Sequence, residues 1–113
     1  MIGDVLDPEH AEMAFEPSAK PVPVEERARL LADPGFGRVF TDHMAIIEYE
    51  DGHWQDARIT ARNPFTLDPA SPVLHYAQEI FEGMKAYRRP SGGAALFRPE
   101  ANARRFAKSA LRM

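Results

Sequence analysis

The stretch that decides the fold is VLHYAQEIFEGMKAYRRPSGGAALFRPEANARRFAKSAL, residues 73–111. In its first part, apolar side chains recur at intervals of three and four residues, at Val73, Tyr76, Ala77, Ile80, Phe81 and Met84. That spacing places them on one face of a helix. It predicts an amphipathic helix over residues 73–84, with Gly83 at the position where a helix ends.

The rest of this stretch predicts a hairpin followed by a second helix. Met84–Arg88 and Ala95–Arg98 flank the turn sequence Pro90-Ser91-Gly92-Gly93. Proline is favoured at the first position of a helix, so Pro99 marks the start of the second one. Its apolar stripe consists of Ala103, Phe106, Ala107, Ala110 and Leu111. No Gly, Asn or Pro ends this helix before Met113, so we expect the chain to be part of a longer one.

Upstream, the sequence predicts another hairpin. Val39–Tyr49 is rich in β-branched and aromatic residues, and Asp51-Gly52 follows it directly. That dipeptide tolerates the positive φ angles of a tight hairpin turn. The partner strand is expected within Trp54–Ala61.

The two hairpins and two amphipathic helices predict an α+β fold. We expect a two-layer sandwich, in which an antiparallel sheet carries helices on one face. A further short helix over Glu25–Leu31 is expected to stop at Asp33-Pro34-Gly35. Residues 1–23 hold four prolines and are expected to form an extended or poorly ordered arm, so that residues 24–113 make up the domain.

The composition excludes several classes of function. The 113 residues are 44% hydrophobic and 27% charged, with a net charge of −3 and no cysteine. The absence of cysteine rules out disulfides and cysteine-ligated zinc. The negative charge argues against binding to nucleic acid or to an anionic membrane surface. No apolar run is long enough to span a membrane and no signal peptide is present, so we expect a cytoplasmic protein.

Polar side chains on the second helix are the first candidate site. Asn102, Arg105 and Ser109 lie three and four residues apart and form one line, pointing away from the apolar stripe. A guanidinium in such a line could bind an anion, or the line could be a solvated helix face. On the first helix, Glu79 and Glu82 are expected to be a solvated pair.

Other candidates leave two interpretations open. Tyr76 could be a core tyrosine or a site residue, and Phe36, between two glycines, could shape a pocket or pack. The four histidines lack the spacing that is typical of metal ligands, so no metal site is expected.

Three segments together resemble a known family. FGRVFTDHM (36–44), LHYAQEIFEGMKAYR (74–88) and LFRPEANARRFAKSA (96–110) are similar to the amino-terminal part of branched-chain amino acid aminotransferases. The resemblance covers residues 24–113, in order. These proteins are class IV, or fold type IV, aminotransferases that use pyridoxal 5′-phosphate. The resemblance implies transfer of the amino group of leucine, isoleucine or valine to 2-oxoglutarate, giving glutamate and a branched-chain 2-oxo acid.

The resemblance also implies residue roles. Arg105 matches the arginine that binds the cofactor phosphate, and Phe36 and Phe81 match aromatics that line the substrate pocket. Tyr76 matches a tyrosine that reaches the neighbouring subunit's pocket, which implies a homodimer.

No lysine of this chain matches the family's catalytic lysine, which resides in a larger carboxyl-terminal domain. The chain is therefore expected to contain no catalytic residue of its own and to be part of a complete enzyme. Two alternatives stay open: a stand-alone, non-catalytic binding domain derived from the family, and a sister class IV activity, either D-amino acid aminotransferase or aminodeoxychorismate lyase.

Overall fold

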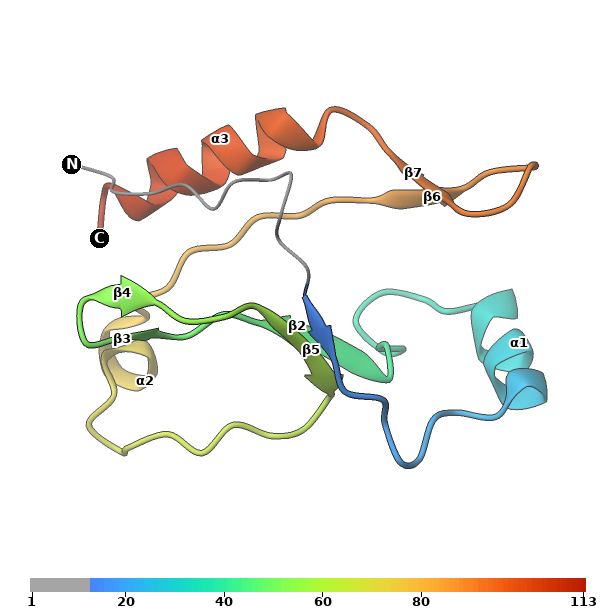
Figure 1. Ribbon diagram of the computed structural model, residues 1–113, viewed down its shortest axis with the longest axis horizontal. Coiled ribbons are helices and arrows are strands. Elements are labelled where there is room, and N and C mark those ends of the chain that lie inside the picture. Colours follow the sequence, from blue (N-terminus) through green and yellow to red (C-terminus); the bar gives the residue numbers. More distant parts are fainter. Residues whose placement is uncertain (1–12) are drawn as a thin grey trace. The chain divides into compact units, whose positions relative to one another are not determined.

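The computed structural model describes residues 13–113 (Figure 1). The described residues divide into two compact units, with the boundary between Phe65 and Thr66. Residues 1–12 of the predicted arm lie outside the described part of the chain. Within residues 13–113, no helix is both long and apolar enough to cross a membrane.

A three-stranded mixed sheet organises the first unit. The strands β1 (Ala14–Phe15), β2 (His43–Ile46) and β5 (Arg58–Ala61) lie in the order β1-β5-β2. β2 runs antiparallel to β5, with Ala45 opposite Ile59, and β1 runs parallel to β5. The central strand β5 is therefore hydrogen-bonded along both edges.

The hairpin predicted at Asp51-Gly52 is confirmed. The strands β3 (Tyr49–Glu50) and β4 (His53–Trp54) pair across a two-residue turn in which Asp51 has φ 52° and Gly52 has φ 83°. Two positive φ angles in succession are typical of a type I′ turn, whose twist matches that of the strands. The rings of Tyr49 and Trp54 meet edge to face, with 5.1 Å between their centroids.

The described part of the arm is extended and is tied to the sheet. Besides forming β1, it donates two backbone hydrogen bonds to side chains at the start of β2. The Ser18 amide donates to His43 Nε2 at 2.8 Å, and the Val22 amide donates to Asp42 Oδ1 at 3.2 Å. The helix α1 (Val24–Ala32) follows and confirms the short helix predicted there.

The second unit contains two helices and one hairpin. The elements are α2 (Pro72–Tyr76), β6 (Ala86–Arg88), β7 (Ala94–Leu96) and α3 (Pro99–Ala110). β6 and β7 pair antiparallel across the predicted turn. The helix α3 begins at Pro99, as predicted, and is the red helix in Figure 1.

The helix predicted over residues 73–84 is wrong in its second half. The helix α2 ends at Tyr76, Ala77 has φ 49°, and residues 77–85 form neither helix nor strand. The exposed fractions are 84% for Tyr76 and 87% for Phe81, so the expected apolar face has little to pack against. A short helix in water is marginal without such packing, because nucleation costs more than the first hydrogen bonds return.

The α+β class is confirmed, with three helices and three short sheets in residues 13–113. The strands do not form the one antiparallel sheet that the sequence suggested: β3–β4 and β6–β7 are separate two-stranded sheets. No side chain in the described part of the chain is fully buried.

Candidate functional site

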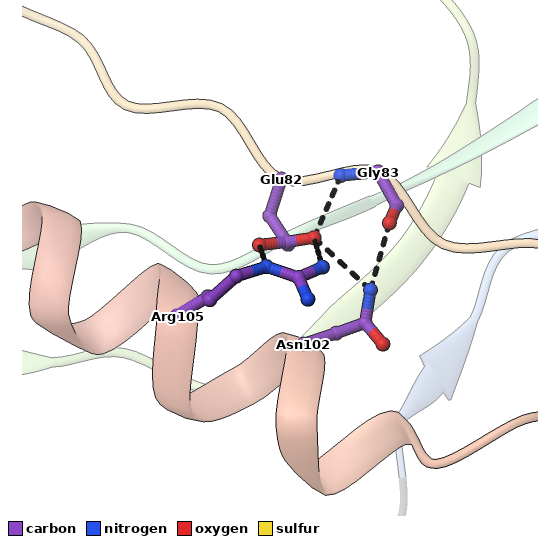
Figure 2. Close-up of polar contacts among 4 residues, drawn as sticks. All are labelled: Glu82, Gly83, Asn102 and Arg105. Carbon is purple, nitrogen blue, oxygen red and sulfur yellow. Dashed lines mark hydrogen bonds and ion pairs between the residues drawn. The ribbon is translucent and has the colours of Figure 1, made fainter.

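An ion pair between α3 and the segment before β6 is the centre of the candidate site (Figure 2). The Nε of Arg105 donates to Glu82 Oε2 at 2.9 Å, and its Nη2 donates to Glu82 Oε1. One carboxylate therefore engages two donors of one guanidinium. This bidentate geometry is stronger and more directional than a single contact between charges.

Asn102 adds two hydrogen bonds one turn earlier on the same helix (Figure 2). Its Nδ2 donates to Glu82 Oε1 at 3.0 Å and to the carbonyl oxygen of Gly83 at 2.7 Å. The Gly83 amide donates to Glu82 Oε1 at 3.2 Å. Residues three apart on a helix lie on the same side, which is why Asn102 and Arg105 reach one carboxylate together.

The pair shifts both titrations in the direction expected for opposite charges. The hydrogen bond from Arg105 lowers the pKa of Glu82, aided by Asn102 and partly opposed by desolvation. The hydrogen bond and charge of Glu82 raise the pKa of Arg105 further above its ordinary range. Both side chains are therefore ionised at neutral pH.

The guanidinium retains donors for a second anion. A guanidinium has five N–H groups, and the contacts with Glu82 use Nε and Nη2. The side chain of Arg105 is 63% exposed, whereas that of Glu82 is 17% exposed. The arrangement can thus hold a carboxylate on one edge of the guanidinium and present Nη1 to a phosphate or another anion.

Glu82 is the site residue that the sequence did not identify. The expectation of a solvated pair with Glu79 depended on a helix that ends at Tyr76, so it is wrong for Glu82. Donors at Asn102 and Arg105 imply a nearby acceptor. With 17 acidic residues in the chain, however, the sequence alone does not say which one.

The three aromatic candidates are placed but are not shown to share a pocket. Phe36 lies in the first unit and is fully exposed, between Gly35 and Gly37. Tyr76 ends α2 in the second unit. Phe81, also in the second unit, lies beside a shallow hollow of about 470 Å³, lined by Glu79, Ile80, Phe81, Ser109, Arg112 and Met113.

Within residues 13–113, no three His, Asp or Glu side chains are grouped so that they could hold a metal ion. Asp42 and His43, adjacent on the chain, each accept a hydrogen bond from the backbone of the arm instead.

Comparisons with known proteins identify the family to which the chain belongs. No family model matches the chain. It is 57% identical over 100 residues to a probable branched-chain-amino-acid aminotransferase of Streptomyces coelicolor, covering 88% of this chain and 28% of that protein. It is 48% identical over 104 residues to a branched-chain-amino-acid aminotransferase of Mycolicibacterium smegmatis, covering 89% and 28%.

A third relative is branched-chain-amino-acid transaminase 1 of Bacillus subtilis, which is 50% identical over 80 residues, covering 70% of this chain and 22% of that protein. The chain thus spans roughly a quarter of the length of the curated relatives that it matches. Over the stretch that they share, the identity is far too high for a chance likeness, and the chain belongs to the branched-chain-amino-acid aminotransferase family.

Proposed function

We propose that the protein containing this chain transfers the amino group of leucine, isoleucine or valine to 2-oxoglutarate, with pyridoxal 5′-phosphate as its cofactor. The observation that carries the proposal is the 57% identity to a probable branched-chain-amino-acid aminotransferase over 88% of the chain. Arg105, with donors that Glu82 does not engage, supplies the matching chemistry.

Arg105 fits a cofactor phosphate. Its exposed guanidinium presents donors beyond those that Glu82 engages, and a phosphate offers several strong acceptor oxygens. Hydrogen bonds between charged groups are roughly twice as strong as neutral ones, so one such arginine can contribute substantially to retaining the phosphate. When bound, this cofactor supplies an electron sink for the negative charge that develops at the substrate's α-carbon.

The substrate side chain would meet apolar walls. We propose that Phe36 and Phe81 line that pocket, and that Tyr76 reaches the pocket of a second subunit in a homodimer. All three side chains are exposed, which leaves them available for such contacts. Burial of apolar area is the only recognition that a branched alkyl group offers, so we expect discrimination among leucine, isoleucine and valine to be modest.

We also propose a domain organisation, a place for the catalytic lysine and a cellular location for the whole protein. Residues 24–113 are proposed to form a small α+β domain, with residues 1–23 as an arm. The lysine that reacts with the cofactor is proposed to lie outside these 113 residues. The protein is proposed to act in the cytoplasm.

A direct assay tests the activity. The full-length protein, loaded with pyridoxal 5′-phosphate, is incubated with 2-oxoglutarate and either L-leucine or D-alanine. We expect glutamate to form with L-leucine and not with D-alanine. Turnover of D-alanine alone would instead indicate a sister class IV activity, and no turnover with either substrate would contradict the proposal.

Arg105→Ala tests the phosphate contact. We expect the full-length protein to bind the cofactor more weakly by about 1.5–3 kcal/mol, the usual range for a hydrogen bond to a charged group. The measurement is an absorbance titration of the apo-protein with pyridoxal 5′-phosphate. Arg104→Ala on the same helix is the matched control, and an equal loss in both variants would remove Arg105 from the site.

A further inference from the structure

We propose that Glu82 is a positioning residue, whose bidentate pair with Arg105 holds the guanidinium ready for the cofactor phosphate and fixes the backbone beside Phe81, the proposed wall of the substrate pocket. The inference rests on the proposed function, because it assigns Glu82 a part in the same site. It adds a coupling between the phosphate contact and the substrate wall.

Arg105 is an exposed side chain that Glu82 holds in one orientation. An exposed arginine has many accessible rotamers, and ordering them opposes the binding of any ligand. Here the Nε and Nη2 donors are already engaged by a carboxylate that is itself mostly covered, with 17% of its side chain exposed. The plane of the guanidinium is thereby fixed, and the Nη1 donors are presented before the phosphate arrives.

Glu82 is itself held by Asn102 of α3. Asn102 donates to both Glu82 Oε1 and the Gly83 carbonyl, so the carboxylate has a second partner on α3. In the part of the chain that the structure describes, no other hydrogen bond ties residues 80–85 to another element. The attachment of this segment to α3 by hydrogen bonds therefore depends on Glu82 and Gly83.

Phe81 directly precedes Glu82 in the chain. Phe81 is 87% exposed, in contrast to the largely covered side chain of Glu82. Phe81 borders the hollow that Ser109 of α3 also lines, and its backbone is bonded directly to that of Glu82, so anchoring Glu82 limits where Phe81 can lie. The same pair that fixes Arg105 thus also fixes the backbone next to Phe81, and the loss of Glu82 should disturb both.

Loss of the Glu82 charge could in principle tighten cofactor binding rather than weaken it. The direction of the change in affinity therefore decides between the two effects. Glu82 neutralises part of the positive charge of Arg105 and repels a phosphate nearby. If this repulsion outweighed the ordering of the guanidinium, removal of the charge would tighten cofactor binding. The ordering of the guanidinium dominates, because the pair is bidentate and leaves Nη1 unobstructed by Glu82.

The test is a double-mutant cycle in the full-length apo-protein, titrated with pyridoxal 5′-phosphate. The variants are Glu82→Gln, Arg105→Ala and the two combined, with Glu79→Gln as the matched control. Gln offers one acceptor oxygen in place of two and carries no charge, so we expect Glu82→Gln to weaken binding about three- to tenfold. Because Glu82 acts through Arg105, the substitution Glu82→Gln should not weaken cofactor binding further in a protein that already carries Arg105→Ala.

The possible results separate the two proposals. Unchanged or tighter binding by Glu82→Gln, or an equal loss with and without Arg105, contradicts the positioning role. An Arg105→Ala variant that binds as the wild type does contradicts the phosphate contact itself. If Glu82→Gln does not fold, as judged by circular dichroism, the same cycle is run with Glu82→Asp, which keeps the charge but shortens the reach.

A second readout follows Phe81. The Michaelis constant for L-leucine should rise in the Glu82→Gln enzyme, assayed at saturating cofactor, and stay unchanged in Glu79→Gln. A leucine Michaelis constant that Glu82→Gln leaves unaltered would contradict the coupling to the substrate wall.

Discussion

At Arg105, one guanidinium serves an internal carboxylate and keeps donors for an outside anion. The contacts with Glu82 use Nε and Nη2, and Asn102 completes the coordination of the carboxylate. Surface ion pairs contribute little to stability in general, because solvent screens them. The main effect of this pair is therefore to orient the guanidinium of Arg105, and its contribution to the free energy of unfolding is small.

The pair makes a prediction about titration. Because Arg105 favours the ionised carboxylate, the pKa of Glu82 should lie below its ordinary value of 4.5. A lowered pKa in the folded state adds stability above pH 4.5, which is lost as the pH falls through the folded-state value. The measurement is a carbon-detected NMR titration of the glutamate carboxyl groups.

In the same titration, Arg105→Ala should return the pKa of Glu82 towards 4.5. A wild-type Glu82 that already titrates there would show that the pair does not persist in solution.

Among the elements, α3 carries a local strain at its start. Arg98 occupies the N-cap position with φ 49° and ψ 54°, in the left-handed region, and its side chain makes no capping hydrogen bond. Residues with a Cβ adopt this region at a cost that glycine avoids. The start of the helix is thus set by Pro99 and by the chain geometry rather than by a capping side chain.

Substitution of Arg98 by glycine should therefore stabilise the fold. We expect Arg98→Gly to raise the free energy of unfolding by about 0.5–1 kcal/mol, measured by denaturant unfolding of the full-length protein. Arg104→Gly, the same change inside α3, should lower it by about 1 kcal/mol. Destabilisation by both would mean that Arg98 is not held in the left-handed region.

The elements that sequence reasoning predicted correctly have local causes. Asp51-Gly52 dictates its own hairpin, and Pro99 marks the start of α3 whatever surrounds it. The parallel pairing of β1 with β5 depends on residues more than forty positions apart, for which no local signal exists. The helix over residues 73–84 failed because periodicity shows that a face is apolar, not that something covers it.

In the candidate site, too, some residues follow from the local sequence and others depend on the path of the chain. The side of α3 that presents Asn102 and Arg105 follows from helical geometry, so it was predictable. Their acceptor was not, since Glu82 reaches them only because the chain leaves the helix at Ala77. The roles of Phe36, Tyr76 and Phe81 stay predictions.

For the molecule as a whole, the exposed apolar surface is the main physical feature. No side chain in residues 13–113 is fully buried, and Phe36, Tyr76 and Phe81 are among the most exposed. Burial of apolar area is the dominant favourable term in folding. These residues by themselves therefore gain little stabilisation from it. The relatives are three to four times longer than the stretch that they share with this chain.

The 113-residue polypeptide expressed alone should therefore be marginally stable. We expect it to bind a hydrophobic dye such as anilinonaphthalene sulfonate and to unfold over a broad temperature range, whereas the full-length protein unfolds cooperatively. Fluorescence and circular dichroism measure both properties. A sharp, dye-free transition of residues 1–113 would show that they form a complete core by themselves.

The most direct test of the account is a crystal structure of the full-length protein with pyridoxal 5′-phosphate bound. We predict that Nη1 of Arg105 lies within hydrogen-bonding distance of a phosphate oxygen, while Glu82 still engages Nε and Nη2 of the same guanidinium. A cofactor phosphate held by other residues, with Arg105 remote from it, would contradict the account.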